Sequence, residues 1–278
     1  KQSSEDKDVS FDFGKDFGQI TLSPNSNALS FKLEASGIDQ FQQIDNVVYL
    51  ESPVYWKIKD VLTEWVQSRE NPFLRRIRKH QKEEVNKIPD YILDTFALLE
   101  NEVKESNVND ELVKIRNKIT ATIGGHIQVS EGGNIQFLEK NNEETTAIDL
   151  HQTATGALSL GVIALLLSKN VIVPNSVLIF DEPEVNLHPA WQQIMVKVLY
   201  LLSTAGVKIV MASHSFDMME SIEKLMDTHD KNKLDINEHF SIIQLKDGNT
   251  VNHDSSLFKK IDSVKADLGM PLFDLLLD

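Results

Sequence analysis

The sequence has 278 residues, enough for one large core or two modest ones, and its 41% hydrophobic and 25% charged residues are typical of a soluble globular protein. No apolar run reaches the roughly 18 residues that a membrane-spanning helix needs, so we expect a soluble, cytoplasmic protein without a membrane partner. Cysteine is absent, which excludes disulfides, thiolate nucleophiles and zinc–thiolate sites. The formal net charge of -14 means that the average surface repels nucleic acid, so any such contact must be local.

The N-terminal part of the chain changes from a strand pattern to a helical one. Residues 11–50 alternate apolar and polar positions in short runs, which predict strands at Phe17–Leu22, Leu29–Leu33 and Val47–Leu50. From Val54 to about Ile119, apolar residues lie three and four apart between charged segments, which predicts a helical lobe. This spacing is seen at Ile92, Phe96, Leu99 and Val103.

The rest of the chain alternates strands with helices. Strand-like alternation around Gly132-Gly133, from Ile127 to Phe137 and again at Ala147–Leu150, predicts a hairpin region. The order of elements that follows predicts right-handed crossovers in a parallel sheet. Those elements are expected at Thr155–Leu167, Val177–Phe180, Pro189–Leu202, Lys208–Ala212 and Phe216–Leu225. A terminal hairpin from Phe240–Leu245 and Thr250-Val251 around Asp247-Gly248, and one or two helices within Leu257–Leu277, complete the chain.

These patterns predict an α/β fold with a parallel sheet core, an antiparallel β region and a helical lobe. We divide the chain into an N-terminal β part of the core at 1–53, a helical insertion at 54–121, the main part of the core at 122–252 and a C-terminal helical segment at 253–278.

The clearest chemical signal is a pair of carboxylates, Asp181 and Glu182, directly after the apolar strand Val177–Phe180. In open α/β sheets, ligands bind beyond the carboxyl ends of such buried strands. Because side chains alternate along an extended backbone, the two carboxylates must have different roles. One can hold a magnesium ion while the other polarises an attacking water. Alternatively, both residues only cap the helix that begins near Pro189.

The next strand also ends in polar residues, at Ser213-His214-Ser215. Sequential strands of a parallel sheet place their carboxyl ends side by side, so His214 should lie near Glu182. A histidine there can donate to a phosphate oxygen or orient a water molecule, whereas a lone histidine is more often a structural hydrogen-bonding residue.

Two further segments fit a phosphate site. Glu184–Pro189 is a polar loop that leads into a helix, with the proline suited to the first helical turn, and by itself it is an ordinary capped loop. Ala154-Thr155-Gly156 precedes an apolar helix, where free N–H groups and a glycine allow an anion to approach closely.

Together these segments resemble the motifs of ABC-type ATPases, members of the P-loop NTPase class. The run LIFDEPEVNLHP resembles a Walker B motif followed by a D-loop, ASHS resembles a switch histidine, and ATGALSLG is similar to a signature motif in which Ala154-Thr155-Gly156 replaces the usual Ser-Gly-Gly or Ser-Ser-Gly. The combination is similar to the AAA-family ATPases of the overcoming-lysogenization-defect and Septu defence groups, whose heads are related to those of SMC and RecF proteins. The resemblance covers roughly residues 150–220.

The resemblance implies a role for each matching residue, with ATP and Mg²⁺ as cofactors. Asp181 would assist magnesium, Glu182 would be the general base and His214 would sense the γ-phosphate. The nucleotide of a second subunit would be contacted by Thr155, Gly156 and Ser159, and Asn186 would bridge a head-to-head homodimer. The implied function is ATP hydrolysis that drives a nuclease or another DNA-handling partner in anti-phage defence.

One motif of this class is missing. The sequence contains no G-x-x-x-x-G-K-S/T, the loop whose N–H groups and lysine would cradle the phosphates. Gly14-Lys15 and Gly18 do not have its spacing, so we expect an N-terminal piece ahead of residue 1 and poor ATP binding by these residues alone. A Q-loop glutamine is also missing after Val47–Leu50, where Glu51 stands.

A cationic cluster in the helical lobe offers a local binding surface. Arg75, Arg76, Arg78 and Lys79 form a ridge that would fit nucleic acid or a partner, although such runs are commonly solvated helix faces and Glu83-Glu84 follow at once. Two functions therefore stand beside each other: a hydrolysing ATPase, and an interaction scaffold that keeps the ATPase fold without turnover.

Overall fold

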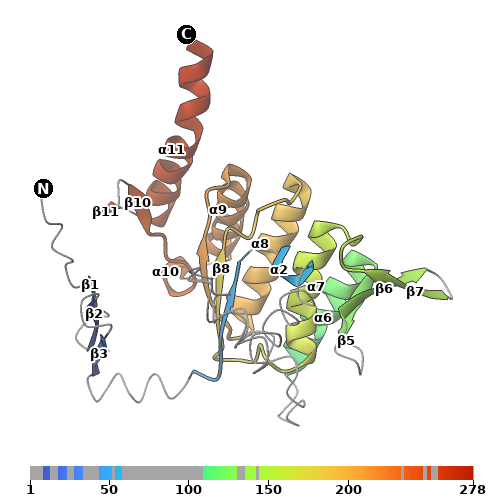
Figure 1. Cartoon of the computed structure of the whole chain (residues 1–278). Helices are drawn as coiled ribbons and strands as arrows, with labels where there is room; N and C mark the ends of the chain where they lie inside the picture. The colour runs from blue at the N-terminus through green and yellow to red at the C-terminus, as the bar shows by residue number, and fades with distance from the viewer. Residues whose placement is uncertain are drawn as a thin grey trace, which may run out of the picture.

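The computed structural model describes residues 9–12, 18–23, 28–33, 44–51, 54–57, 109–129, 135–141, 144–232, 235–246, 249–251 and 256–277. Figure 1 shows the helices and strands along the chain. They are β1 (Val9–Asp12), β2 (Gly18–Ser23), β3 (Ala28–Leu33), β4 (Val47–Leu50), α2 (Val54–Lys57), α6 (Asp110–Ile123), β5 (Gly125–Val129), β6 (Ile135–Asn141), β7 (Glu144–Asp149), α7 (Thr155–Ser168), β8 (Val177–Asp181), α8 (Pro189–Thr204), β9 (Lys208–Ala212), α9 (Phe216–Lys231), α10 (Ile236–His239), β10 (Gln244–Lys246), β11 (Asn249–Val251) and α11 (Leu257–Leu277).

The predicted parallel sheet is present in the order β4-β8-β9. Leu50 pairs with Phe180, and Phe180 pairs with Met211, so the three strands end at one edge. The inward side chains of β4 and β8, such as Val48 and Leu178, are buried, as expected for strands covered by helices. Because β8 lies between the other two strands, whatever follows it is flanked by the ends of both.

Helices α7, α8 and α9 lie beside this sheet (Figure 1). Every residue of α7 from Ala157 to Leu167 is buried, because the helix is apolar on all sides and packs against α6 and β5. Helix α8 packs against α9 and β9. The expected bounds of α7 and α8 are right to within two residues, and Gly206, with φ of 91°, lies in the turn after α8.

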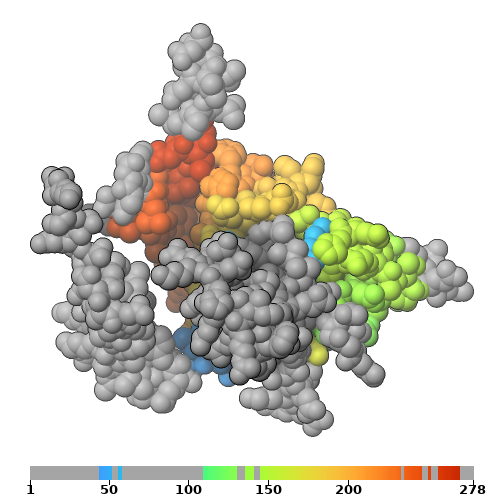
Figure 2. Space-filling model, in the orientation of Figure 1, coloured from blue at the N-terminus to red at the C-terminus, as the bar shows by residue number. Residues whose placement is uncertain are grey.

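The predicted hairpin region is a three-stranded antiparallel sheet in the order β5-β6-β7, with Ile127 opposite Phe137. Both of these side chains belong to the same buried cluster as Leu178 of the parallel sheet, so the two sheets share one hydrophobic core. Figure 2 shows the green antiparallel region adjoining the yellow segments around α7 and α8. Strands β1, β2 and β3 form a further antiparallel sheet, in which β2 and β3 match the strands expected there.

Two expected bounds were wrong near the C-terminus. Helix α9 runs to Lys231 instead of stopping at Leu225, because His229 is buried and its Nδ1 contacts the Tyr200 hydroxyl at 2.8 Å. A strand was expected at Phe240–Leu245, but the observed strand, β10, begins only at Gln244. It pairs antiparallel to β11, and the short helix α10 ends at His239, before Phe240. The Phe240 ring stacks on Tyr200, with ring centroids 6.0 Å apart, so this residue serves packing instead of strand pairing.

The last segment forms a single helix, α11, which packs against α9. Ile261 of α11 is fully buried, and the Lys265 ammonium lies 2.6 Å from a Glu223 carboxylate oxygen of α9. The hydrogen bond to Glu223 raises the pKa of Lys265. Several features of the sequence lie outside the described residues: the helical spacing at Ile92, Phe96, Leu99 and Val103, the cluster of Arg75, Arg76, Arg78 and Lys79, and the turns at Gly132-Gly133 and Asp247-Gly248.

Candidate active site

The carboxyl ends of β8 and β9 form the centre of the site. Asp181 pairs with Ala212, and the backbone N–H of Glu182 donates to the carbonyl oxygen of Ala212 at 2.9 Å. Glu182 then takes a left-handed conformation, with φ of 48°, which is uncommon for a residue with a side chain. This turn ends the strand and leaves the Glu182 carboxylate half-exposed at the edge of the sheet.

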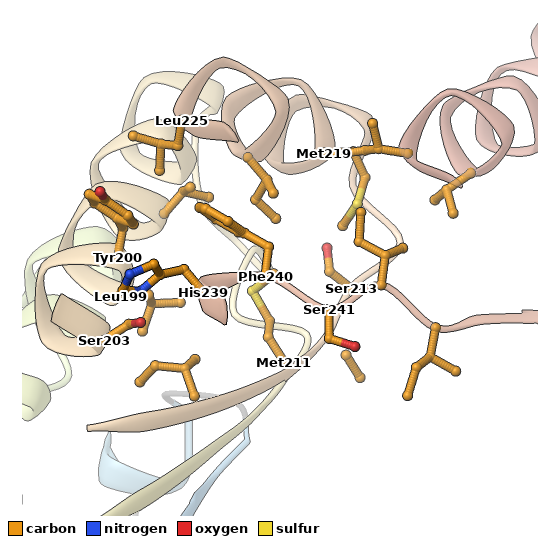
Figure 3. A pocket seen from close by; sticks show the side chains of 18 of the residues that line it. Leu199, Tyr200, Ser203, Met211, Ser213, Met219, Leu225, His239, Phe240 and Ser241 are labelled. Carbon is orange, nitrogen blue, oxygen red and sulfur yellow. The ribbon is translucent and has the colours of Figure 1, made fainter. Parts of the chain in front are cut away.

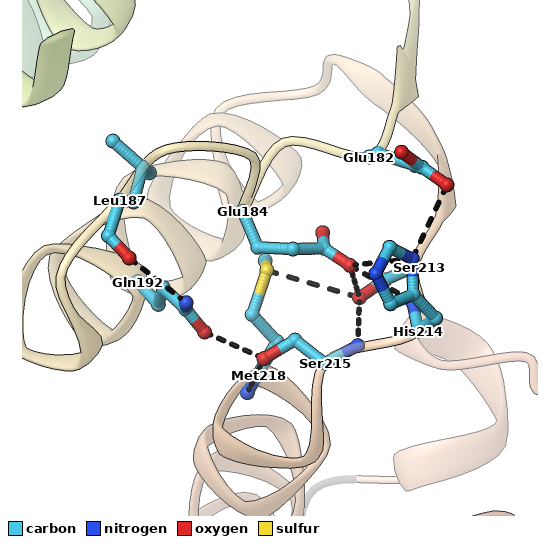
Figure 4. Close-up of polar contacts among 8 residues, drawn as sticks. All are labelled: Glu182, Glu184, Leu187, Gln192, Ser213, His214, Ser215 and Met218. Atoms are coloured by element: carbon cyan, nitrogen blue, oxygen red, sulfur yellow. Dashed lines mark hydrogen bonds and ion pairs between the residues drawn. The ribbon is translucent and has the colours of Figure 1, made fainter. Parts of the chain in front are cut away.

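His214 lies beside Glu182, as the strand order predicts. The imidazole Nδ1 is 3.2 Å from Oε1 of Glu182, and the histidine side chain is 66% exposed (Figure 4). If Nδ1 carries the proton of a neutral ring and donates it to the carboxylate, Nε2 remains an acceptor. The pair therefore presents a carboxylate and an imidazole to a ligand beyond the sheet.

Asp181 has a different environment, as expected from strand alternation. The hydroxyl of Tyr49, on β4, donates to Oδ2 of Asp181 at 2.9 Å. This contact fixes the orientation of one carboxylate oxygen and leaves the other for a cation. Tyr49 was not predicted as a site residue.

A buried hydrogen-bond network lies directly behind His214 (Figure 4). Oε1 of Glu184 accepts from the Ser213 hydroxyl and from the backbone N–H of His214, both at 2.8 Å. The hydroxyl of Ser215 donates to Gln192, whose amide nitrogen donates to the carbonyl oxygen of Leu187 at 3.1 Å. Glu184 and Gln192 are buried; the sequence places Glu184 only in the polar loop beside the site, and it does not identify Gln192.

The loop between β8 and α8 is tightly turned. The backbone N–H of Val185 donates to the backbone carbonyl oxygen of Glu182 at 3.0 Å. The N–H of Leu187 donates to the backbone carbonyl oxygen of Glu184 at 2.9 Å. Asn186 is exposed, with φ of 59°, a conformation that asparagine tolerates well. His188 is the N-cap of α8 through its Nδ1, and Pro189 occupies the first turn as expected. Helix α8 is thus capped by His188, not by Asp181 or Glu182.

The start of α7 carries the other predicted nucleotide contacts. Its N-cap, Ala154, makes no side-chain hydrogen bond, so the first N–H groups are not capped by that residue. Ser159 is buried and its hydroxyl donates to the carbonyl oxygen of Thr155 at 3.0 Å. A Cβ on Gly156 would lie 2.8 Å from the Trp191 ring of α8, so this glycine permits close helix packing. No contact in the described residues joins Thr155, Gly156 or Ser159 to Glu182 or His214, and their roles stay predictions.

A pocket of about 790 Å³ runs along β9, between α8 and α9 on one side and residues 238–245 and α11 on the other. Figure 3 shows Leu199, Tyr200 and Phe240 at one end and Met219 near Ser213 at the other. Within the described residues β9 pairs with β8 alone, so the other edge of β9 faces this pocket. The pocket is mainly lined by apolar side chains and reaches His214.

No group of three or more histidine or acidic side chains in the described ranges could hold a metal by itself. A magnesium ion at Asp181 fits this arrangement, because Mg²⁺ commonly takes one or two carboxylates and completes its shell with water and phosphate. Among the described helices, none is long and apolar enough to cross a membrane.

A parallel sheet that brings an Asp-Glu pair and a histidine together at adjacent carboxyl ends is the arrangement expected of a nucleoside triphosphatase of the α/β, P-loop class. The chain belongs to the AAA ATPase domain family, which it matches over residues 18–219. No curated protein matches the sequence. The expected α/β fold and the ATPase class are therefore confirmed, and the fold implies nucleotide use.

Solved structures of SMC and ABC transporter proteins resemble this chain only remotely. An SMC ATPase, from work on ATP-driven dimerization and DNA-stimulated activation, shares 12% identity, with 64% of this chain and 96% of that chain covered and a TM-score of 0.37. The Smc head domain of Pyrococcus furiosus bound to the C-terminal domain of ScpA shares 15% identity over 64% of this chain and 47% of its own, with a TM-score of 0.30. The cbiO1 protein of Clostridium perfringens, part of the ABC transporter complex cbiONQ, shares 17% identity over 71% and 59%, with a TM-score of 0.28.

Exchange of Tyr49 for phenylalanine should weaken the support of Asp181. The variant loses one partly buried hydrogen bond to a carboxylate, so we expect a loss of about 1 kcal/mol in the free energy of unfolding. If Asp181 holds magnesium, the Mg²⁺ concentration for half-maximal activity should rise about 10-fold. Urea unfolding and a magnesium titration measure the two effects. Tyr200→Phe, which removes a hydroxyl bonded to His229 instead, should leave the magnesium titration unchanged.

Proposed function

We propose that this chain is the hydrolytic part of an ATPase head in which Glu182 is the general base, His214 contacts the γ-phosphate and Asp181 assists Mg²⁺. The observation that carries the proposal is the 3.2 Å contact between Glu182 and His214 at the joined ends of β8 and β9. Both side chains are more than half exposed, at 66% for His214 and 51% for Glu182, so a ligand can reach them.

The chemistry follows from the two environments. The exposed carboxylate of Glu182 can accept a proton from, or orient, the water that attacks the γ-phosphate. With both ring nitrogens protonated, His214 can donate its Nε2–H to a phosphate oxygen that gains charge in the transition state, while its Nδ1–H stays with the carboxylates. Magnesium, when bound with ATP, would supply neutralisation of the phosphate charge. Asp181, oriented by Tyr49, is the residue that would hold it.

The head would act as a pair. Thr155, Gly156 and Ser159 at the start of α7 would meet the nucleotide of a second copy, and exposed Asn186 would bridge the two. The start of α7 favours an anion because its N–H groups are not capped by the side chain of Ala154. Nucleotide-gated pairing would drive a nuclease or another DNA-handling partner in anti-phage defence of the overcoming-lysogenization-defect or Septu type. Arg75, Arg76, Arg78 and Lys79 would form a local contact with nucleic acid.

A complete ATP site also needs a phosphate-binding loop, which residues 1–278 do not contain. We propose that a strand leading into such a loop would fit the pocket beside β9, along the edge that no described strand covers. The unpaired edge of β9 within the described residues and the extension of the pocket to His214 support this placement, since the strand would end beside the carboxylates.

Steady-state phosphate release with magnesium and ATP tests the proposal, comparing the natural protein at full length with residues 1–278 alone. We expect hydrolysis by the natural protein and ATP-dependent dimers in light scattering. Absence of hydrolysis in the natural protein at any ATP concentration, with or without DNA, would overturn it.

The second candidate is an interaction scaffold that keeps the ATPase fold without turnover. The missing G-x-x-x-x-G-K-S/T loop favours it, because without that loop the β and γ phosphates lose their main protein ligands. Binding of a labelled ATP analogue to the natural protein separates the two: a hydrolysing head must bind it, whereas a scaffold does not.

A further inference from the structure

Glu184 is a buried carboxylate next to the site whose hydrogen bonds all go to the turn after β9. Its side chain is 5% exposed, and no lysine or arginine contacts it among the described residues. Burial of a charged carboxylate costs free energy unless hydrogen bonds compensate it. The Ser213 hydroxyl and the His214 N–H compensate Oε1, whereas the buried Oε2 has no hydrogen-bond partner among the described residues.

We propose that Glu184 is a positioning residue that fixes the place and the ring orientation of His214, an inference that rests on the proposed function of that histidine. The same Oε1 atom that accepts the backbone N–H of His214 lies 3.6 Å from ring Nδ1. Glu184 therefore holds residue 214 through its backbone and attracts the Nδ1 side of its ring.

Glu182 alone cannot supply this support. It lies closer to Nδ1, at 3.2 Å, but its side chain is 51% exposed, and a general base must turn toward the attacking water. Glu184 is enclosed and has no such second task. When Glu182 engages water, Glu184 keeps Nδ1 occupied and Nε2 directed to the ligand. In Figure 4 the two carboxylates approach the imidazole from different parts of the loop.

The turn has a second anchor, at Ser215, which ties the start of α9 to α8. Ser215 caps α9 by accepting from the N–H of Met218 at 3.3 Å, and its hydroxyl donates to Gln192 of α8. The side-chain amide of Gln192 in turn donates a hydrogen bond to the carbonyl oxygen of Leu187. The loop that carries Asn186 is thus bonded to the turn at Glu184 on one side and through Leu187 on the other. A shift of this loop would reach His214 through Glu184.

Ring nitrogen spectroscopy tests the proposal on residues 1–278 without any requirement for hydrolysis. Long-range ¹H–¹⁵N spectra report the tautomer of each of the 8 histidines, with His214 assigned by its loss in His214→Gln. We expect one dominant Nδ1–H tautomer in the unmodified chain and a shift toward an exchange-averaged ring in Glu184→Ala. Should that variant fail to fold, Glu184→Asp keeps the charge but withdraws the carboxylate by one methylene, and the same shift is expected.

Ser215→Ala is the matched control. It breaks the contact to Gln192 and the α9 cap on the same turn, but leaves Glu184 in place, so the His214 signals should stay as in the unmodified chain. Unchanged His214 signals in a folded Glu184 variant, or an equal shift in Ser215→Ala, would overturn the proposal.

Kinetics of the natural protein at full length give an independent readout. Glu184→Ala should lower kcat about 10- to 100-fold, as loss of a residue that orients a catalytic ligand commonly does, with the KM for ATP nearly unchanged. A raised KM with unchanged kcat would contradict a positioning role. If the unmodified natural protein hydrolyses no ATP, the proposed function fails, whereas the ring spectra still decide whether Glu184 positions His214.

Discussion

Exchange of Glu182 for glutamine is expected to lower magnesium-dependent ATP hydrolysis by the natural protein at least about 100-fold, because general-base catalysis commonly contributes about 10²- to 10⁴-fold. The amide keeps the shape of the side chain and can still contact Nδ1 of His214, but it cannot accept a proton from water. ATP binding should persist, since the exposed carboxylate is not needed to hold the phosphates. Phosphate release and binding of a labelled ATP analogue measure the two quantities separately.

Glu111→Gln provides the matched control for this variant. Glu111 is an exposed residue of α6 whose carboxylate pairs with Lys114 at 2.7 Å, so its exchange should leave hydrolysis within about two-fold, as for most surface substitutions. If Glu182→Gln hydrolysed ATP as fast as Glu111→Gln, Glu182 would not be the base, and the contact with His214 would be structural.

The central geometry of the site could be predicted because it depends only on strand order. An apolar strand that ends in Asp181-Glu182 and a second that ends at His214, joined by one helix, leave parallel pairing as the favoured arrangement. Parallel pairing then places the two ends together, and the 3.2 Å contact follows. The roles of Asp181, Glu182 and His214 remain predictions, because proximity does not establish catalysis.

The residues that support this geometry could not be predicted, because their partners lie far away in the sequence. Tyr49 meets Asp181 across 132 positions, and Glu184 meets Ser213 across 29. Neither pairing leaves a local pattern. Gly156 shows the same limit: a glycine at a helix start suggested an approaching phosphate, whereas the Trp191 ring packs against it. The shortened strand at Phe240 likewise reflects ring stacking that a window of neighbouring residues does not reveal.

Truncation of Leu166 to alanine is expected to destabilise the fold by about 2–5 kcal/mol, the usual range for a core leucine. Leu166 has no exposed surface, and it lies in the helix that joins the antiparallel sheet to the parallel one within a single core. For a chain of this length each kcal/mol shifts the unfolding temperature by roughly 2–4 °C. Urea unfolding should show a lower midpoint with an unchanged slope, because the surface exposed on unfolding hardly changes.

Ser168→Ala tests whether burial, rather than any change in α7, causes this loss. Ser168 is exposed at the last residue of the same helix, so its exchange should alter stability by less than about 0.5 kcal/mol. An equally small effect at Leu166 would mean that α7 does not pack as described. The substitution of Leu166 should also affect α8, because the first turn of α7, at Thr155 and Gly156, packs on Trp191 of α8. Loosening of α7 should therefore also reach α8, and the ring signals of Trp191 should broaden in Leu166→Ala at temperatures where the chain is still folded.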